Sequence, residues 1–422
     1  MSEESLRRAT RRESGVPDKI GAMSDHAALF AALADAPPDR VLDELVERLR
    51  AADEPDLLFD ALLLKAKRDL GAPGVRPSTF DGVPEEQAEA FEKAYLAAAR
   101  EAARRHADAG RLDRAFDYAR TIGEPPLLRP YLEDVDPQSF VGPDADEERF
   151  ELLASIALEE GVHPELGARL MLAARGTCNT VTAVDSLWPR FKPEERTAVA
   201  AVLADHLHGE LLANVAAEIA AHPSGGKLPE NPTSLRPLLA GRPWLMADTA
   251  YHTDVSHLQA VVRNGRELPP EHPSFEKIVE LAEYGAKLDP TLQYPGRAPF
   301  TEFYPSHLRY LAAISGRGRE EAFRYFEGRI DAADDHDRPA AAIELVHLLK
   351  RCGEVDRAVA LARKELRDRE DALFSFADLC RDVDRLDALA DAAKEADDPV
   401  RYAAALFVKA EDGRRKAEGD GA

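Results

Sequence analysis

The chain has little cysteine and no long hydrophobic run, and each shortage excludes a class of protein. Its three cysteines, Cys178, Cys352 and Cys380, lie far apart with no CxxC pair, so neither a disulfide framework nor a cysteine-based zinc site is expected. No stretch of about 18 apolar residues occurs, and the charged N-terminus lacks the apolar core of a signal peptide. We therefore expect a cytoplasmic protein that does not span a membrane.

Basic residues are also scarce relative to acidic ones. Lys and Arg number 55 against 78 Asp and Glu, which gives a formal net charge of -23. A chain of this charge repels phosphate backbones and anionic lipid surfaces at long range. Nucleic acid and membranes are therefore not expected as partners, whereas a basic peptide or protein is favoured.

Aromatic residues make up only 7% of the chain, although 45% of it is hydrophobic. Alanine runs such as Ala97-Ala98-Ala99 supply much of that hydrophobic content and favour closely packed helices over sheets. At 422 residues the chain exceeds the usual size of one compact domain. The composition predicts an all-α protein made of several domains or of one elongated repeat array.

Two stretches have the pattern of helical hairpins. Between Asp39 and Leu70, apolar residues recur at helical spacing in two segments that are separated near Pro55. Further on, one long helix is predicted to end near Gly110, and a second helix begins at once.

The junction at Gly110 recurs near the C-terminus. Gly110-Arg-Leu-Asp-Arg-Ala115, followed by Ala119-Arg120, matches Gly353-Glu-Val-Asp-Arg-Ala358, followed by Ala362-Arg363. A small residue in the turn and alanines at the helix crossing resemble the tetratricopeptide repeat. This resemblance implies stacked helical hairpins, an α-solenoid, whose concave surface binds peptides or proteins.

The middle of the chain differs from its ends because Pro and Gly are dense in two long loops, around 221–244 and 287–305. Long loops in a helical protein are often functional. The predicted organisation is a disordered extension at 1–24, with Met23 as an alternative start, a helical-repeat block at 25–150, a central helical segment at 151–304, a tetratricopeptide-like block at 305–410 and a disordered tail at 411–422.

Seven of the 12 histidines fall between His206 and His307. If one helix begins near Glu194, its apolar face is formed by Val199, Val202, Leu203 and Leu207. His206, Glu210 and Asn214 project from that face, and His208 points away. The pair His206 and Glu210 is then either part of a functional site or a buried hydrogen bond between helices.

The stretch from Tyr251 to Glu267 allows two interpretations. One helix from Trp244 to Arg263 would leave His252 on the solvent side. Alternatively, the helix begins after Asp254, whose side chain caps it, and ends at Asn264-Gly265. His252 then lies in a loop and His257 in the first helical turn.

A metal site is the functional hypothesis for this region. His206 and Glu210, joined by His252 or His257 and by His307, are enough to hold zinc or non-haem iron. Asp254 would orient a ligand histidine. Such a site would make the protein a metal-dependent hydrolase or oxidase.

Two further side chains are candidates for catalysis. Tyr304 lies beside His307 at a proline-marked helix start. Cys178 follows Gly176, a predicted helix end, and lies at the start of a new helix, where a thiol is activated. No complete catalytic signature is present, so peptide or protein binding is the leading prediction and a metalloenzyme the alternative.

Overall fold

The regular elements in the described part of the chain are helices. The computed structural model describes residues 26–72, 74–246, 252–370 and 374–419. Within these residues there is no β-strand, and one isolated bridge joins Glu370 and Ser375. None of the described helices combines the length and the apolar character that crossing a membrane requires. The prediction of an all-α chain is confirmed.

The chain divides into two compact units. The first contains residues 1–180 and 189–191, and the second contains residues 181–188 and 192–422. The predicted block boundaries at 150 and 304 stay predictions. The extension at 1–24 lies outside the described residues.

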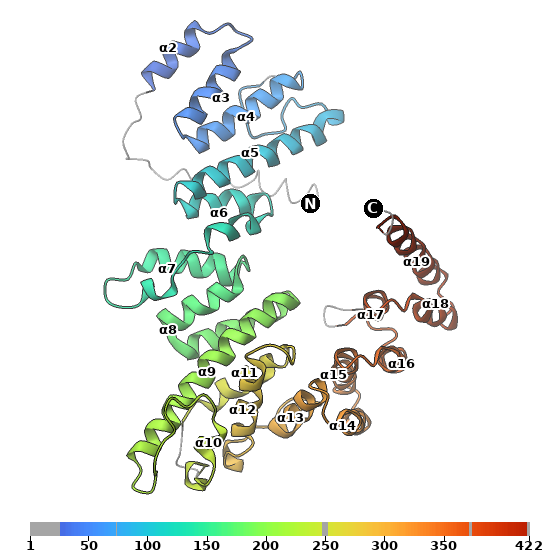
Figure 1. Cartoon of the computed structure of the whole chain (residues 1–422). Helices are drawn as coiled ribbons and strands as arrows, with labels where there is room; N and C mark the ends of the chain where they lie inside the picture. The colour runs from blue at the N-terminus through green and yellow to red at the C-terminus, as the bar shows by residue number, and fades with distance from the viewer. Residues whose placement is uncertain (1–25, 73, 247–251, 371–373, 420–422) are drawn as a thin grey trace. The chain divides into compact units, whose positions relative to one another are not determined.

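The first unit is a succession of helices, and from α2 to α6 each helix packs on the next (Figure 1). Helix α3 packs on α4, α4 on α5 and α5 on α6. The elements are α2 (Ala27–Asp35), α3 (Val41–Ala51), α4 (Pro55–Asp69), η1 (Glu85–Gln87), α5 (Ala88–Asp108), α6 (Leu112–Thr121), η2 (Pro125–Tyr131), η3 (Pro137–Phe140), α7 (Glu147–Ala154), the π-helical turn η4 (Ser155–Glu159) and the start of α8 (Pro164–Leu187).

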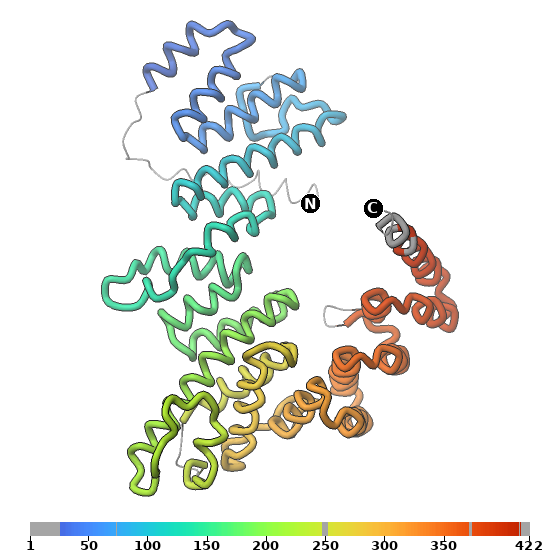
Figure 2. Tube along the Cα trace, viewed as in Figure 1, coloured from blue at the N-terminus to red at the C-terminus, as the bar shows by residue number. Residues whose placement is uncertain are grey.

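In the second unit, too, helices that are neighbours in the sequence pack against each other, and Figure 2 traces the elements in chain order. Helix α9 packs on both α11 and α12, and from α11 to α19 each helix contacts the next. The elements are η5 (Trp188–Arg190, which spans the unit boundary), α9 (Pro193–Ala221), α10 (Arg236–Leu239), η6 (Pro243–Met246), α11 (Val255–Gly265), α12 (Phe275–Gly285), η7 (Pro290–Leu292), α13 (Phe303–Ile314), α14 (Arg319–Ala332), α15 (Arg338–Arg351), α16 (Val355–Glu365), α17 (Phe376–Asp382), α18 (Leu386–Glu395) and α19 (Pro399–Gly419).

The two matching sequence junctions have matching turns. Gly110 and Gly353 adopt positive φ angles of 75° and 82°, which suit glycine because it has no Cβ. In both turns the next residue donates its backbone N–H to the carbonyl oxygen four residues before the glycine, at 2.9 Å. The alanines of both crossings are fully buried: Ala115, Ala119, Ala358 and Ala362. The predicted hairpins α5–α6 and α15–α16 are therefore present.

A second internal similarity, between α11 and α12, becomes visible only in the structure. Both helices have 11 residues and end in a glycine, Gly265 or Gly285, that lies at a helix crossing. A Cβ atom would lie 2.2 Å from Ile278 Cδ1 at Gly265 and 2.2 Å from Tyr304 Cε1 at Gly285. The missing side chains thus allow α12 to approach α11 and α13 to approach α12.

Candidate functional site

Helix α9 exposes the predicted ligands and buries a different histidine. His206 is partly exposed and Glu210 is exposed, whereas His208 is only 2% exposed, so the predicted orientations of His206 and His208 were wrong. The reason is that α9 packs on both α11 and α12, which widens its buried face beyond the predicted one to include Ala204, His208, Leu211 and Val215. His206 Nε2 lies 3.3 Å from Glu210 Oε2, so these two side chains do pair, on the flank of the helix.

The buried His208 belongs to a polar cluster around Glu280 of α12. The Glu280 carboxylate lies 2.9 Å from His208 Nε2 and accepts hydrogen bonds from Ser234 Oγ at 2.6 Å and from the Leu235 N–H at 2.7 Å. Burial alone would raise the pKa of Glu280, but these hydrogen bonds lower it to about 2. The cluster fastens the loop before α10 to helices α9 and α12.

Asp254 is the N-cap of α11, as the second interpretation of this stretch predicted. Its side chain accepts hydrogen bonds from the backbone N–H groups of Ser256 and His257. His257 lies partly buried in the first turn, and His252 precedes the helix in the loop. A single local capping rule therefore located this helix start.

His252 is buried, and each of its ring nitrogens lies close to a polar group. Nε2 lies 2.7 Å from Glu218 Oε2, and Nδ1 lies 2.8 Å from Tyr284 Oη. Asn214 Nδ2 also donates to the His252 carbonyl oxygen at 2.8 Å. Burial lowers the pKa of His252, and the nearby Glu218 opposes that effect. A neutral imidazole whose Nδ1 accepts a hydrogen bond from the Tyr284 hydroxyl fits these surroundings, whereas Nε2 contacts Glu218 without hydrogen-bond geometry.

We expect stability to fall on mild acidification because of His252. Its folded-state pKa lies below the ordinary value, so the unfolded chain binds more protons as the pH falls through about 6.5. Stability contributed by the neutral ring is present above that pH and is lost below it. Urea unfolding between pH 7.5 and 5.5 measures the slope, which we expect to be shallower in His252→Asn. An unchanged slope in the variant would contradict the assignment.

Tyr304 and His307 are packed into the core at the start of α13. Tyr304 is fully buried, and its hydroxyl has no hydrogen-bond partner among the described residues. His307 Nδ1 donates to the Phe303 carbonyl oxygen at 2.7 Å, and its ring lies 4.3 Å from that of Phe300. Burial lowers the pKa of His307 well below its usual range. Both side chains serve as packed, neutral core groups.

Cys178 lies just after the predicted helix break. Gly176 has a φ angle of 75° and bends α8, so the second segment of that helix starts beside the cysteine. The thiol is free and exposed. This placement agrees with the predicted local structure.

The predicted metal ligands do not gather into one site. Among the described residues, no three His, Cys, Asp or Glu side chains lie close enough together to hold a metal ion. His206 and Glu210 form one pair, and His252 instead pairs with Glu218. Metal binding by His206, Glu210, His252, His257 and His307 stays a prediction that this geometry does not support.

The sequence patterns did not predict the roles of Glu218 and Glu280, the carboxylates that contact His252 and His208. Glu280 lies between Val279 and Leu281 and is only 5% exposed. A charged residue inside the apolar run of α12 was the available signal, because such a group must be paired when it is buried.

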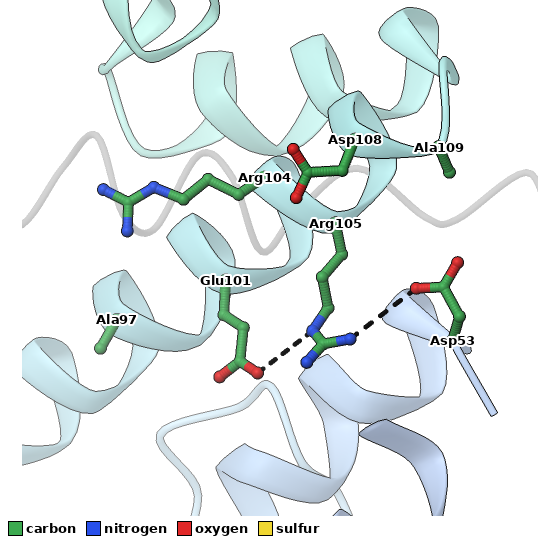
Figure 3. A pocket seen from close by; sticks show the side chains of 7 residues that line it. All are labelled: Asp53, Ala97, Glu101, Arg104, Arg105, Asp108 and Ala109. Atoms are coloured by element: carbon green, nitrogen blue, oxygen red, sulfur yellow. Dashed lines mark hydrogen bonds and ion pairs between the residues drawn. The ribbon is translucent and has the colours of Figure 1, made fainter. Parts of the chain in front are cut away.

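A separate hollow in the first unit was also not predicted. It has a volume of about 640 Å³ and is lined by Asp53, Ala97, Glu101, Arg104, Arg105, Asp108 and Ala109. Figure 3 shows Arg105 between Glu101 and Asp53, at 3.3 Å and 3.8 Å. Because its walls are mostly charged, the hollow suits polar contacts rather than a buried apolar ligand.

Comparisons of the chain with known protein families, with curated proteins and with solved structures give no match.

Proposed function

We propose that the protein is a cytoplasmic helical-repeat scaffold, built of tetratricopeptide-like hairpins, that binds a basic peptide or protein. Stacked hairpins such as α5–α6 and α15–α16 support this proposal because arrays of this kind present extended surfaces. The three free cysteines fit a reducing compartment.

One acidic stretch of the first unit carries the proposal. Residues 133–165 contain 11 acidic side chains and a single basic one, Arg149. Most of these carboxylates are exposed, and Val141 beside them is 54% exposed. A surface of one sign attracts segments of the opposite sign and steers their association.

Only part of this charge is used inside the chain. Asp136 and Asp146 cap η3 and α7, and Arg175 pairs with Glu147 and Glu151. Four exposed carboxylates of the stretch form neither an ion pair nor a side-chain hydrogen bond within the described residues: Glu133, Asp134, Asp144 and Glu148. These four are available to a basic partner.

We expect neutralisation of these four carboxylates to weaken binding of a basic probe. The probe is a fluorescent 15-residue peptide of Arg, Gly and Ser, and its affinity is measured by anisotropy at several salt concentrations. Substitution to Gln or Asn should weaken binding at least about fivefold at ~0.1 M salt and reduce the salt dependence, because exposed charges act within about 10 Å.

A matched control separates a local surface from total charge. It neutralises four exposed acidic residues of the same unit outside the stretch: Glu47, Glu86, Asp113 and Asp117. If both quadruple variants bind equally well, only net charge matters, and the proposed surface is wrong.

A further inference from the structure

His106 lies at the centre of a polar cluster in the first unit. It belongs to α5 and is only 3% exposed. Its Nε2 atom lies 3.0 Å from Asp56 Oδ1 of α4, and its Nδ1 atom lies 3.0 Å from Nε of Arg111, the residue just before α6. One buried imidazole therefore connects the hairpin α3–α4 with the turn of the hairpin α5–α6.

The contact with Arg111 decides which ring nitrogen of His106 carries the proton. A guanidinium group only donates hydrogen bonds, so Nδ1 accepts this bond and carries no proton of its own. The single proton of the neutral ring is then on Nε2, which donates it to Asp56. In this state both nitrogen atoms of the ring are used.

Asp56 has further partners on α6. Tyr118 Oη donates to Asp56 Oδ1 at 2.9 Å, and Arg114 donates to Oδ2 at 3.2 Å. Burial alone would raise the pKa of Asp56, but its hydrogen bonds lower it, so this carboxylate is charged wherever histidine titrates. The charged and titratable groups of the cluster come from α4, the turn and α6: Asp56, Asp60, Arg111, Arg114 and Tyr118, whose ring is stacked on that of His106.

A second proton on His106 would reverse these contacts. Histidine is the side chain whose charge changes between pH 5 and 8. Once Nδ1 is protonated it no longer accepts a bond from Arg111, and the two cations repel each other. Arg111 already lies 3.5 Å from Asp53, which lines the hollow in Figure 3, so this carboxylate is ready to take the arginine. The bond from Nε2 to Asp56 becomes charge-assisted and therefore stronger.

We infer that His106 is a pH-sensitive latch in the first unit. In its neutral form it holds Arg111 and, with it, the turn between α5 and α6. In its protonated form it releases Arg111 toward Asp53 and binds Asp56 more tightly. None of these residues lies in 133–165, so the latch is independent of the proposed binding surface.

Double-mutant cycles at pH 7.5 and pH 5.0 test the latch, with urea unfolding as the measurement. For His106→Gln and Arg111→Met, we expect a favourable coupling at pH 7.5 of at least about threefold in the unfolding equilibrium constant. At pH 5.0 this coupling should be lost or unfavourable. The coupling of His106→Gln with Asp56→Asn should instead grow on acidification. Contributions of other histidines, such as His252, cancel within each cycle.

Arg50→Met with Glu101→Gln is the matched control cycle. This ion pair joins α3 to α5 at 2.8 and 2.9 Å and contains no histidine. Hydrogen bonds from Arg50 keep the pKa of Glu101 below its ordinary value, so its coupling should be equal at both pH values. A coupling of His106 with Arg111 that does not change with pH would overturn the inference. So would two His106 couplings that change in the same direction.

Nitrogen-15 NMR of the histidine rings tests the latch in the wild-type chain, whether or not the variants fold. The His106 signals are recognised by their contact with the Tyr118 ring. We expect a proton on Nε2 alone at pH 7.5 and a doubly protonated ring at pH 5.0. A proton on Nδ1 at pH 7.5, or a ring that is still neutral at pH 5.0, would also reject the latch.

Discussion

Gly285→Ala is expected to lower the free energy of unfolding by about 2–3 kcal/mol, the upper part of the range of about 1–3 kcal/mol for forcing extra atoms into a close-packed core. The added Cβ would lie 2.2 Å from Tyr304 Cε1 and 2.3 Å from its Cζ. Because Tyr304 is fully buried and its ring is rigid, relief requires α12 and α13 to separate.

Urea unfolding followed by circular dichroism measures this loss. Gly209→Ala is the matched control, because Gly209 is an exposed residue of α9 whose Cβ would meet nothing within 4 Å. There alanine should stabilise the helix by up to about 1 kcal/mol. A Gly285→Ala protein as stable as the wild type would show that the crossing of α12 and α13 is looser than described.

Gly265→Ala should be milder than Gly285→Ala. Its Cβ would lie 2.2 Å from Ile278 Cδ1 and 2.5 Å from Cγ1, atoms that side-chain rotation can move, rather than from a rigid ring. The comparison of the two variants thus tests whether the rigidity of the neighbour determines the cost of the added methyl group.

Local chemistry explains what the sequence predicted correctly. A left-handed glycine ends α5 and α15, and an aspartate side chain caps α11, and both rules concern residues close together in the chain. The all-α class followed from composition. Each of these features depends on few residues, so no knowledge of the tertiary packing was needed.

The sequence predicted poorly which side chains contact one another, because these contacts depend on how the helices pack together. His208 is buried although it was predicted to point away from the apolar face, and His206 is partly exposed on the flank of the helix, since both α11 and α12 contact α9. Glu280 lies 72 positions from His208 along the chain, and no spacing rule joins them. The groups that lie against His208 and His252 are carboxylates from far along the chain and, for His252, a tyrosine.

The two buried clusters give the long loop between α9 and α11 a physical explanation. Glu280 holds Ser234 and Leu235 near the start of α10, and Glu218 holds His252 just before α11. Leu238 and Leu245, from the loop itself, are fully buried. Both polar contacts and buried leucine side chains therefore stabilise the described parts of this Pro/Gly-rich segment.

Glu280→Ala is expected to cost about 3–5 kcal/mol, which is typical when one member of a buried polar pair is removed. It would leave His208 Nε2, Ser234 Oγ and the Leu235 N–H without the carboxylate they share. Unfolding in urea measures the loss. Glu283→Gln is the control, because Glu283 contacts the more exposed Arg236, and we expect less than about 1 kcal/mol there.

The pH dependence identifies the carboxylate charge as the source of this stability. Glu280 has a folded-state pKa of about 2, against an ordinary value of 4.5. The unfolded chain therefore binds more protons between these values, so the contribution is complete above pH 4.5 and is lost as the pH falls toward 2. The stability difference between wild type and Glu280→Gln should narrow between pH 7 and 3.5. A constant difference would mean that shape, rather than charge, makes Glu280 necessary.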